Sequence, residues 1–296
     1  LQIADIHLAE EHGASSDDCA GATPIDTTGA GSMLLAGSHD LLRPSALSTI
    51  EDIELAERTV NANGTETVTF VFDLDGNTSR STFTVERDGS RFGVFAAWKF
   101  VTPPLSIVRL TVANAQGFTA NGSEFVTPTQ DTPSPYVVLA PSSFDISHTS
   151  TFLTAEPIRV SATDPGKTVR ARLDVVANDA MVAQVQREVN DYLDECATQV
   201  VLLPTGCPFG QPMANRIVTT PEWSMATYPE VTLVPGSATG SWLMPATDGA
   251  AHLTVDVRSI FDGSVSTFDE DVDFTASYLV TFMPEDELLI TAQYPN

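Results

Sequence analysis

Apolar and polar residues alternate along most of this chain, and one stretch departs from the alternation. From Ile53 onward, apolar positions recur at every second residue in many segments, which is the period of half-buried β-strands. Only Asn178–Gly210 has a strong helical period. The cleanest strand pattern, Asp271–Met283, alternates over Val272, Phe274, Ala276, Tyr278, Val280 and Phe282. The pattern therefore predicts a β-rich chain organised around one main helix.

The stretch with helical period predicts an amphipathic helix over residues 179–200. Asn178 or Asp179 suits the N-cap, because a short polar side chain can accept a hydrogen bond from a free backbone N–H. Apolar residues then recur at steps of three and four, which places them on one face. This face comprises Val182, Val185, Val189, Tyr192, Leu193, Cys196 and Val200. We expect it to pack on a twisted antiparallel sheet.

The N-terminal part of the chain shows weaker helical signals. Residues 1–12 have modest helical character, and residues 13–32 are rich in the small and polar residues typical of loops. The segment HDLLRPSALSTI predicts a second short helix that is broken near Pro44. An antiparallel meander follows, with turns at Asp75-Gly76-Asn77 and Asp88-Gly89.

Beyond Pro103-Pro104, residues 105–177 hold short strands separated by Pro and Thr, without a helical pattern, which predicts a small β-sandwich-like module. Strands return after the helix. They are expected at residues 216–224, 231–234, 240–245, 251–259, 271–283 and 287–293.

The predicted fold class combines α+β and all-β domains. Two small helix-plus-antiparallel-sheet domains, NTF2- or cystatin-like, flank the β-sandwich-like module. The three domains are expected at residues 1–102 (with 1–37 partly irregular), 103–177 and 178–296.

Two of the three cysteines, Cys196 and Cys207, enclose a ten-residue segment that contains Pro204 and Gly206 and reverses the chain. A metal site would need two more soft ligands, and no other Cys or His lies nearby. We therefore expect a disulfide, contributing about 2–3 kcal/mol by loop-closure arithmetic, and an oxidising compartment outside the cytoplasm. Cys19 is left over, either free or bonded outside this chain.

The charge balance limits the partners. The net charge is −25, from 39 acidic and 14 basic residues. Such a surface repels phosphate backbones and anionic lipids, so we expect no nucleic-acid partner and favour a cationic or neutral one. No apolar run is long enough to span a membrane, and the missing initiator Met indicates an excised fragment such as a trimmed ectodomain.

No stretch carries a catalytic or cofactor signature. The Gly-x-Ser-x-Gly pattern of serine hydrolases is absent, and His252, expected to open a strand, is interpreted as a surface residue. A reactive cysteine needs a basic neighbourhood that this acidic chain hardly offers. We therefore expect no cofactor and favour a non-enzymatic role.

Two groups are candidates for ligand binding. An acidic run is a weak calcium candidate, although a charged strand entrance is the simpler interpretation. It comprises Asp269, Glu270, Asp271 and Asp273. Trp223 and Trp242 are candidates for a carbohydrate platform, although aromatic residues in strand patterns usually belong to the core.

Two longer runs carry a family resemblance: WKFVTPPLSIVRLTVANAQGFTANG and VQREVNDYLDECATQVVLLPTGCPFG. They resemble extracellular regions of actinobacterial single-pass membrane-anchored proteins of unknown function. The portion TVANAQGFTANGSEF is also similar to small β modules of the teicoplanin-resistance-associated membrane protein family. The resemblance covers roughly residues 40–296. It implies a location at the cell surface and an anchor N-terminal to this chain, and it assigns no chemistry.

These observations lead to one main functional hypothesis and two alternatives. The main one is a non-enzymatic extracellular domain of a cell-envelope protein that binds or senses an envelope component, or an extracellular protein or glycan. The first alternative is an envelope hydrolase that acts on glycan or peptide through carboxylates brought together by the fold. The second is a subunit of a surface assembly.

Overall fold

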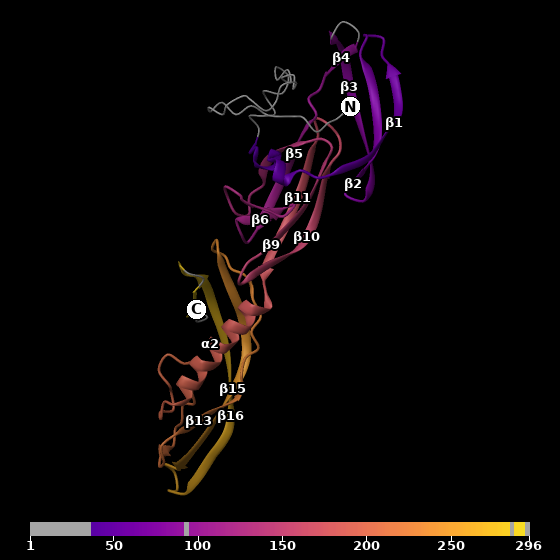
Figure 1. Ribbon diagram of the computed structural model, residues 1–296. Coiled ribbons are helices and arrows are strands. Elements are labelled where there is room, and N and C mark those ends of the chain that lie inside the picture. Colours follow the sequence, from indigo (N-terminus) through magenta and orange to yellow (C-terminus); the bar gives the residue numbers. More distant parts are fainter. Residues whose placement is uncertain (1–36, 92–94, 285–286, 294–296) are drawn as a thin grey trace. The chain divides into compact units, whose positions relative to one another are not determined.

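The computed structural model describes residues 37–91, 95–284 and 287–293, and most of them lie in strands (Figure 1). The strands form three sheets, of four, seven and six strands, and one long helix, α2, accompanies the third sheet. This confirms a β-rich fold with one main helix. The predicted helix over residues 1–12 and Cys19 lie outside the described residues.

The chain divides into two compact units. The first consists of Leu1–Thr111, Gly117–Ile146 and Pro157–Leu173, and the second of Val112–Gln116, Ser147–Glu156 and Asp174–Asn296.

The four-stranded sheet is the predicted antiparallel meander, in the order β1-β2-β3-β4. At the β2–β3 turn, Asp75 and Gly76 both have positive φ, 51° and 80°, as a tight hairpin between right-handed twisted strands requires. The Asp73 carboxylate accepts a hydrogen bond from the Gly76 backbone N–H at 2.5 Å. The strands are β1 (Ile50–Val60), β2 (Glu66–Leu74), β3 (Asn77–Arg91) and β4 (Phe95–Phe100).

The predicted short helix near Pro44 consists of two 3-10 turns, Asp40–Leu42 and Pro44–Ala46, separated at Arg43. The sequence placed this segment in the same domain as the N-terminal meander, but it packs on the seven-stranded sheet. Leu42 lies against the buried pair Leu105 and Val137. A backbone bridge joins Ser38 to Tyr136 in the same sheet.

The seven-stranded sheet has the order β7-β6-β9-β10-β11-β5-β8 and curls around its own core. Phe118 on β6 and Tyr136 on β8 lie near opposite ends of this order, yet their ring centroids are 5.7 Å apart in an edge-on contact. One curled sheet therefore encloses the core where the sequence predicted a sandwich-like module. The strands are β5 (Leu105–Ala113), β6 (Gly117–Ala120), β7 (Ser123–Val126), β8 (Ser134–Leu139), β9 (Ser142–Thr149), β10 (Leu153–Ala162) and β11 (Thr168–Ala177).

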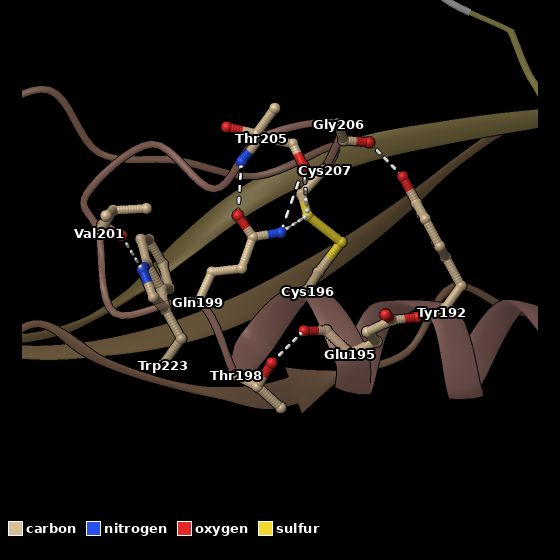
Figure 2. Close-up of a disulfide and its surroundings, with 10 residues drawn as sticks. All are labelled: Tyr192, Glu195, Cys196, Thr198, Gln199, Val201, Thr205, Gly206, Cys207 and Trp223. Atoms are coloured by element: carbon tan, nitrogen blue, oxygen red, sulfur yellow. Dashed lines mark hydrogen bonds between the residues drawn. A yellow bond between two sulfur atoms is a disulfide. The ribbon is translucent and has the colours of Figure 1, made fainter.

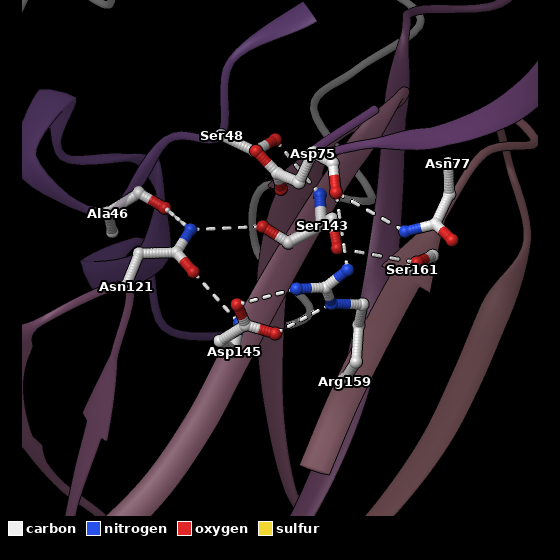
Figure 3. A network of polar contacts seen from close by, with 9 residues as sticks. All are labelled: Ala46, Ser48, Asp75, Asn77, Asn121, Ser143, Asp145, Arg159 and Ser161. Atoms are coloured by element: carbon white, nitrogen blue, oxygen red, sulfur yellow. Dashed lines mark hydrogen bonds and ion pairs between the residues drawn. The ribbon is translucent and has the colours of Figure 1, made fainter. Parts of the chain in front are cut away.

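A polar network joins the curled sheet to the segment that contains Ala46 (Figure 3). The Asn121 amide donates to the backbone carbonyls of Ala46 (2.8 Å) and Ser143 (3.0 Å), and its oxygen accepts from the Asp145 N–H (2.8 Å). Arg159 forms a two-pronged ion pair with the Asp145 carboxylate at 2.7 and 2.9 Å. Hydrogen bonds from Arg159 lower the pKa of Asp145 below its ordinary value. Asn121 thus uses both ends of its amide.

Helix α2 runs over Asp179–Ala197, three residues shorter than predicted, and it begins where the sequence indicated. The Asn178 side chain accepts a hydrogen bond from the Met181 N–H at 3.0 Å, which confirms the N-cap. Val200 lies beyond the helix end and is 61% exposed, so its predicted place on the buried face is wrong. The buried residues of the helix are Met181, Val185, Val189, Leu193 and Cys196.

The C-terminal sheet is built on one long hairpin, β15 (Ser241–Arg258) and β16 (Val265–Phe282). The sequence predicted two strands where β15 is continuous, because a bulge between Met244 and Thr247 interrupts its alternation. Strand β16 pairs with one edge of β15 and with β17 (Leu288–Ala292). The other edge of β15 pairs with three short strands: β12 (Arg216–Ile217), β13 (Glu222–Thr227) and β14 (Val234–Pro235).

One face of this hairpin is the core of the second unit. Helix α2 packs on that face, where Tyr192 meets Tyr278 edge-on with centroids 6.3 Å apart (Figure 1). Gly249 is paired across the strands with Phe274, and a Cβ at Gly249 would lie 2.6 Å from the Phe274 Cζ atom. The Phe274 ring therefore occupies the space that a side chain at position 249 would need. Both strands send their alternate side chains to the opposite face.

Candidate functional site

The outward face of the β15–β16 hairpin carries a row of polar cross-strand pairs, which we call the polar ladder. Alternation along the strands produces it: the buried residues Ala251, Leu253 and Val255 on β15 are interleaved with outward polar residues. The polar ladder comprises Asp248, His252, Thr254 and Asp256 on β15 and Thr267, Asp269, Asp271 and Thr275 on β16.

Each rung of the polar ladder is a hydrogen-bonded pair. Thr267 donates to Asp256 (2.7 Å), Thr254 donates to Asp269 (3.0 Å) and Thr275 donates to Asp248 (2.9 Å). The imidazole nitrogens of His252 lie 2.7 Å from an Asp271 carboxylate oxygen and 2.8 Å from an Asp269 carboxylate oxygen. Each carboxylate thus faces a hydroxyl or an imidazole, which avoids the repulsion of like charges placed directly opposite each other.

His252 is the centre of the charge arrangement. Hydrogen bonds to Asp271, and then to Asp269, raise the pKa of the imidazole above its ordinary value. Hydrogen bonds from His252 and Thr254 lower the pKa of Asp269. The His252 side chain is 35% exposed, so water weakens both interactions. The arrangement favours an imidazolium held between two carboxylates.

The neighbourhood of His252 also contains a serine. Ser224 on β13 lies opposite His252, which in turn lies opposite Asp271, so a Ser, a His and an Asp stand on three adjacent strands. Acyl transfer requires a neutral imidazole with one nitrogen directed at the serine hydroxyl. Here carboxylates engage both nitrogens, and the raised pKa favours the charged form. The geometry is that of an ion pair rather than of a general base.

A hollow of about 550 Å³ adjoins the polar ladder and shares Thr254 and Asp256 with it. The Glu222 carboxylate and several threonines offer acceptors and hydroxyls to a ligand here. The lining residues are Val218, Thr219, Thr220, Glu222, Thr254 and Asp256. Among the hydroxyls, that of Thr219 already accepts a hydrogen bond from the Asp256 N–H at 2.8 Å. The chemistry of this hollow suits a ligand with amine or hydroxyl groups.

The acidic run of the sequence is split by the pleat of β16. Alternation places Asp269, Asp271 and Asp273 on the outward face and Glu270 on the opposite one. Asp269 and Asp271 are bound to His252, and Asp273 faces Ala250. In the described part of the chain, no group of three or more His, Cys, Asp or Glu side chains is arranged to hold a metal ion. The calcium prediction therefore gains no support from this grouping.

The two candidate tryptophans are both in the core. Trp242 is 1% exposed and Trp223 is 8% exposed. The Trp223 indole N–H donates to the Val201 carbonyl at 2.8 Å, and its ring packs on Phe209 with centroids 5.1 Å apart. The prediction of a carbohydrate platform on these residues is wrong, because both rings are buried and neither has a face free for a ligand.

Cys196 and Cys207 form the expected disulfide, with an S–S distance of 2.05 Å and a Cα–Cα distance of 5.8 Å (Figure 2). Around the bridge, the Gln199 side chain accepts from the Thr205 N–H (2.8 Å) and donates to the Thr205 carbonyl (3.2 Å). The Tyr192 hydroxyl donates to the Gly206 carbonyl. The loop after α2 is thus fixed by a covalent bond and by polar contacts.

The sequence pointed to His252 and to the acidic run separately and missed their association. His252 lies inside β15 rather than at the start of a strand. The sequence did not indicate Glu222, Asp248 or Asp256 as site residues, because isolated acidic residues are common in this chain. One signal could have indicated the polar ladder: in two neighbouring strands, polar residues alternate with the apolar residues that are buried. Only the pairing register shows which of them meet.

Comparison of the chain with protein-family models, with curated proteins and with solved structures found no match. Among the described residues, no helix has the length and apolar character needed to cross a membrane.

Proposed function

We propose that this protein is a non-enzymatic extracellular binding protein of the cell envelope, and that the polar ladder and the adjoining hollow bind amine-bearing groups of an envelope component. The observation that carries the proposal is the ladder itself: carboxylates repeat on an exposed sheet face, each held in place by a cross-strand partner. Partners that fix the carboxylates in advance reduce the ordering cost of binding.

The chemistry of the ligand follows from the spacing and the charge. Alternate residues on a strand lie about 7 Å apart, so Asp269, Asp271 and Asp273 on β16 present carboxylates at a regular spacing to an extended polymer. Ammonium groups would form charge-assisted hydrogen bonds with these carboxylates. The net charge of −25 would also increase the rate at which a cationic partner approaches. A glycan or protein with repeated amines meets both conditions.

Two further observations support the proposed location. The Cys196–Cys207 disulfide is of the kind that persists in oxidising compartments. The resemblance to extracellular regions of actinobacterial membrane-anchored proteins belongs to the same proposal. It would place the domain on the outer face of the cell membrane, attached through an anchor that precedes this chain.

Binding of a glucosamine oligomer and of its N-acetylated form tests the proposal, because acetylation removes the positive charges and leaves the glycan backbone unchanged. Isothermal titration calorimetry of the full chain should show binding of the amine form only. The double variant Glu222→Gln/Asp256→Asn should weaken this binding at least roughly tenfold, since the loss of even one hydrogen bond to a charged group costs about 1.5–3 kcal/mol.

The matched control is Glu51→Gln/Glu57→Gln, which removes the same charge from exposed positions on β1. Equal binding by both double variants would assign the affinity to net charge and would refute the proposed site. If only the Glu222/Asp256 double variant loses binding, a pull-down against envelope fractions, peptidoglycan included, would identify the natural component.

A further inference from the structure

A second hollow, of about 320 Å³, has the opposite charge and lies in the first unit on the seven-stranded sheet. Three arginines line it. Arg109 comes from β5, Arg170 and Arg172 come from β11, and these strands are hydrogen-bonded neighbours in the sheet. The remaining lining residues are Thr111, Pro133 and Ala171. Among the residues that the structure describes, no carboxylate lines this hollow.

This gathering of arginines is unusual for the chain. Only 14 of its residues are Lys or Arg, against 39 acidic residues, and three of the 14 line one hollow. The strand pattern explains how they converge: on β11 the exposed Arg170 and Arg172 alternate with Ala171 and the buried Leu173. Arginines on neighbouring strands bring like charges together, and a bound anion would reduce the repulsion between them.

The guanidinium groups of Arg109 and Arg170 have no hydrogen-bond or ion-pair partner among the residues that the structure describes. Arg172 has an interaction within the chain, so the argument rests on the other two. In the first unit, some other arginines have carboxylate partners: Arg58 pairs with Glu66 at 2.6 Å, and Arg159 pairs with Asp145 at 2.7 Å. The exposed Arg80 and Arg87 have none among the described residues, but they do not line this hollow. What distinguishes Arg109 and Arg170 is that they line the same hollow, where one anion would pair with both.

We propose that this arginine hollow binds a phosphate group carried by a small ligand or by a polymer. A planar guanidinium donates two parallel hydrogen bonds to a phosphate, and the negative charge of the phosphate balances the neighbouring arginines. Pro133 and Ala171 provide apolar surface beside the arginines for the carbon atoms of a phosphate ester. The site is separate from the polar ladder and independent of the function proposed for it.

Calorimetric titration of the full chain tests this proposal with three probes: inorganic phosphate, glycerol 3-phosphate as a monoester, and dimethyl phosphate as a diester. The ionic strength is held constant with chloride near the physiological value, where distant acidic charges are largely screened. Saturable one-to-one binding of inorganic phosphate is expected. Tighter binding of the monoester would indicate a small phosphorylated ligand, and tighter binding of the diester would indicate a phosphodiester polymer.

The variant Arg109→Gln/Arg170→Gln should weaken phosphate binding at least roughly tenfold, because each lost guanidinium removes charge-assisted hydrogen bonds. The control Arg80→Gln/Arg187→Gln removes the same charge from exposed residues outside the hollow and should bind as the parent protein does. Unchanged thermal transitions would show that both variants fold. Equal losses in the two double variants, or no saturable phosphate binding by the parent protein, would overturn the proposal.

Discussion

The His252 Nδ1 atom lies 2.7 Å from an Asp271 carboxylate oxygen, directly across the β15–β16 hairpin. This pair joins the two longest strands at the middle of the polar ladder. It also places an imidazole, the side chain whose ordinary pKa lies closest to neutral pH, on the surface that we propose for binding.

The pairing of His252 makes the stability of the second unit depend on pH. The pKa of folded His252 is raised above its ordinary 6.5, so its stabilising contribution is complete below about pH 6.5 and is lost as the pH rises through the raised value. The pKa of Asp269 is lowered from 3.8, so its contribution is present above that value and is lost as the pH falls through the lowered one. The pairing therefore stabilises most between these limits.

Urea unfolding of the parent protein and of His252→Gln, at about pH 5.5 and about pH 9, checks this expectation. The parent protein should be the more stable of the two at the lower pH, and its advantage should shrink at the higher pH. An advantage that is the same at both pH values would contradict the prediction. Titration of the His252 ring followed by NMR should give a pKa above 6.5.

Removal of the disulfide should cost about 2–3 kcal/mol of unfolding free energy, because the loop it closes is short. The double variant Cys196→Ala/Cys207→Ala tests this in denaturant. Intact-mass analysis after thiol alkylation provides an independent check. Alkylation of both cysteines without a reductant would show that they are not bridged.

Asn121→Ala should destabilise the first unit by about 1–3 kcal/mol, because two backbone carbonyls lose their donor and the Asp145 N–H loses its acceptor. Asn121 also has a positive φ of 48°, which alanine tolerates poorly. Asn121→Gly keeps the backbone freedom and removes only the amide. If thermal unfolding shows that glycine restores full stability, the loss is a backbone effect and the hydrogen bonds contribute little.

Gly249→Ala should destabilise the second unit by about 1–3 kcal/mol, since its methyl group would overlap the Phe274 ring. The smaller side chain of Phe274→Leu should remove part of this clash. In a double-mutant cycle, the double variant should therefore lose less stability than the sum of the two single variants. If the losses of stability in the two single variants add up to the loss in the double variant, the methyl group at position 249 does not clash with the Phe274 ring.

The sequence predicted the elements whose cause is local. Helix α2 was identified from its spacing of apolar residues and from Asn178, the β2–β3 turn from Asp75-Gly76, and the disulfide from the spacing of two cysteines around a turn. Each of these depends on residues that are close together in the chain.

Contacts between distant segments were not predictable in the same way. Residues 38–46 pack on the seven-stranded sheet through Leu42, and an apolar residue does not specify which surface will cover it. The polar ladder depends on the register between β15 and β16, and the Met244–Thr247 bulge shifts that register. Trp223 lies between the polar residues Glu222 and Ser224, and alternation alone does not tell which face of the strand is the core.

The two edges of strand β15 are paired in different ways. Along one edge it is joined to β16 almost from end to end, and along the other it is joined to three short strands in succession. The loops that connect those short strands do not belong to the long hairpin. Evolution can therefore lengthen, shorten or exchange these links while the hairpin keeps its register, and the rim of the hollow beside the polar ladder can diversify without rebuilding the sheet.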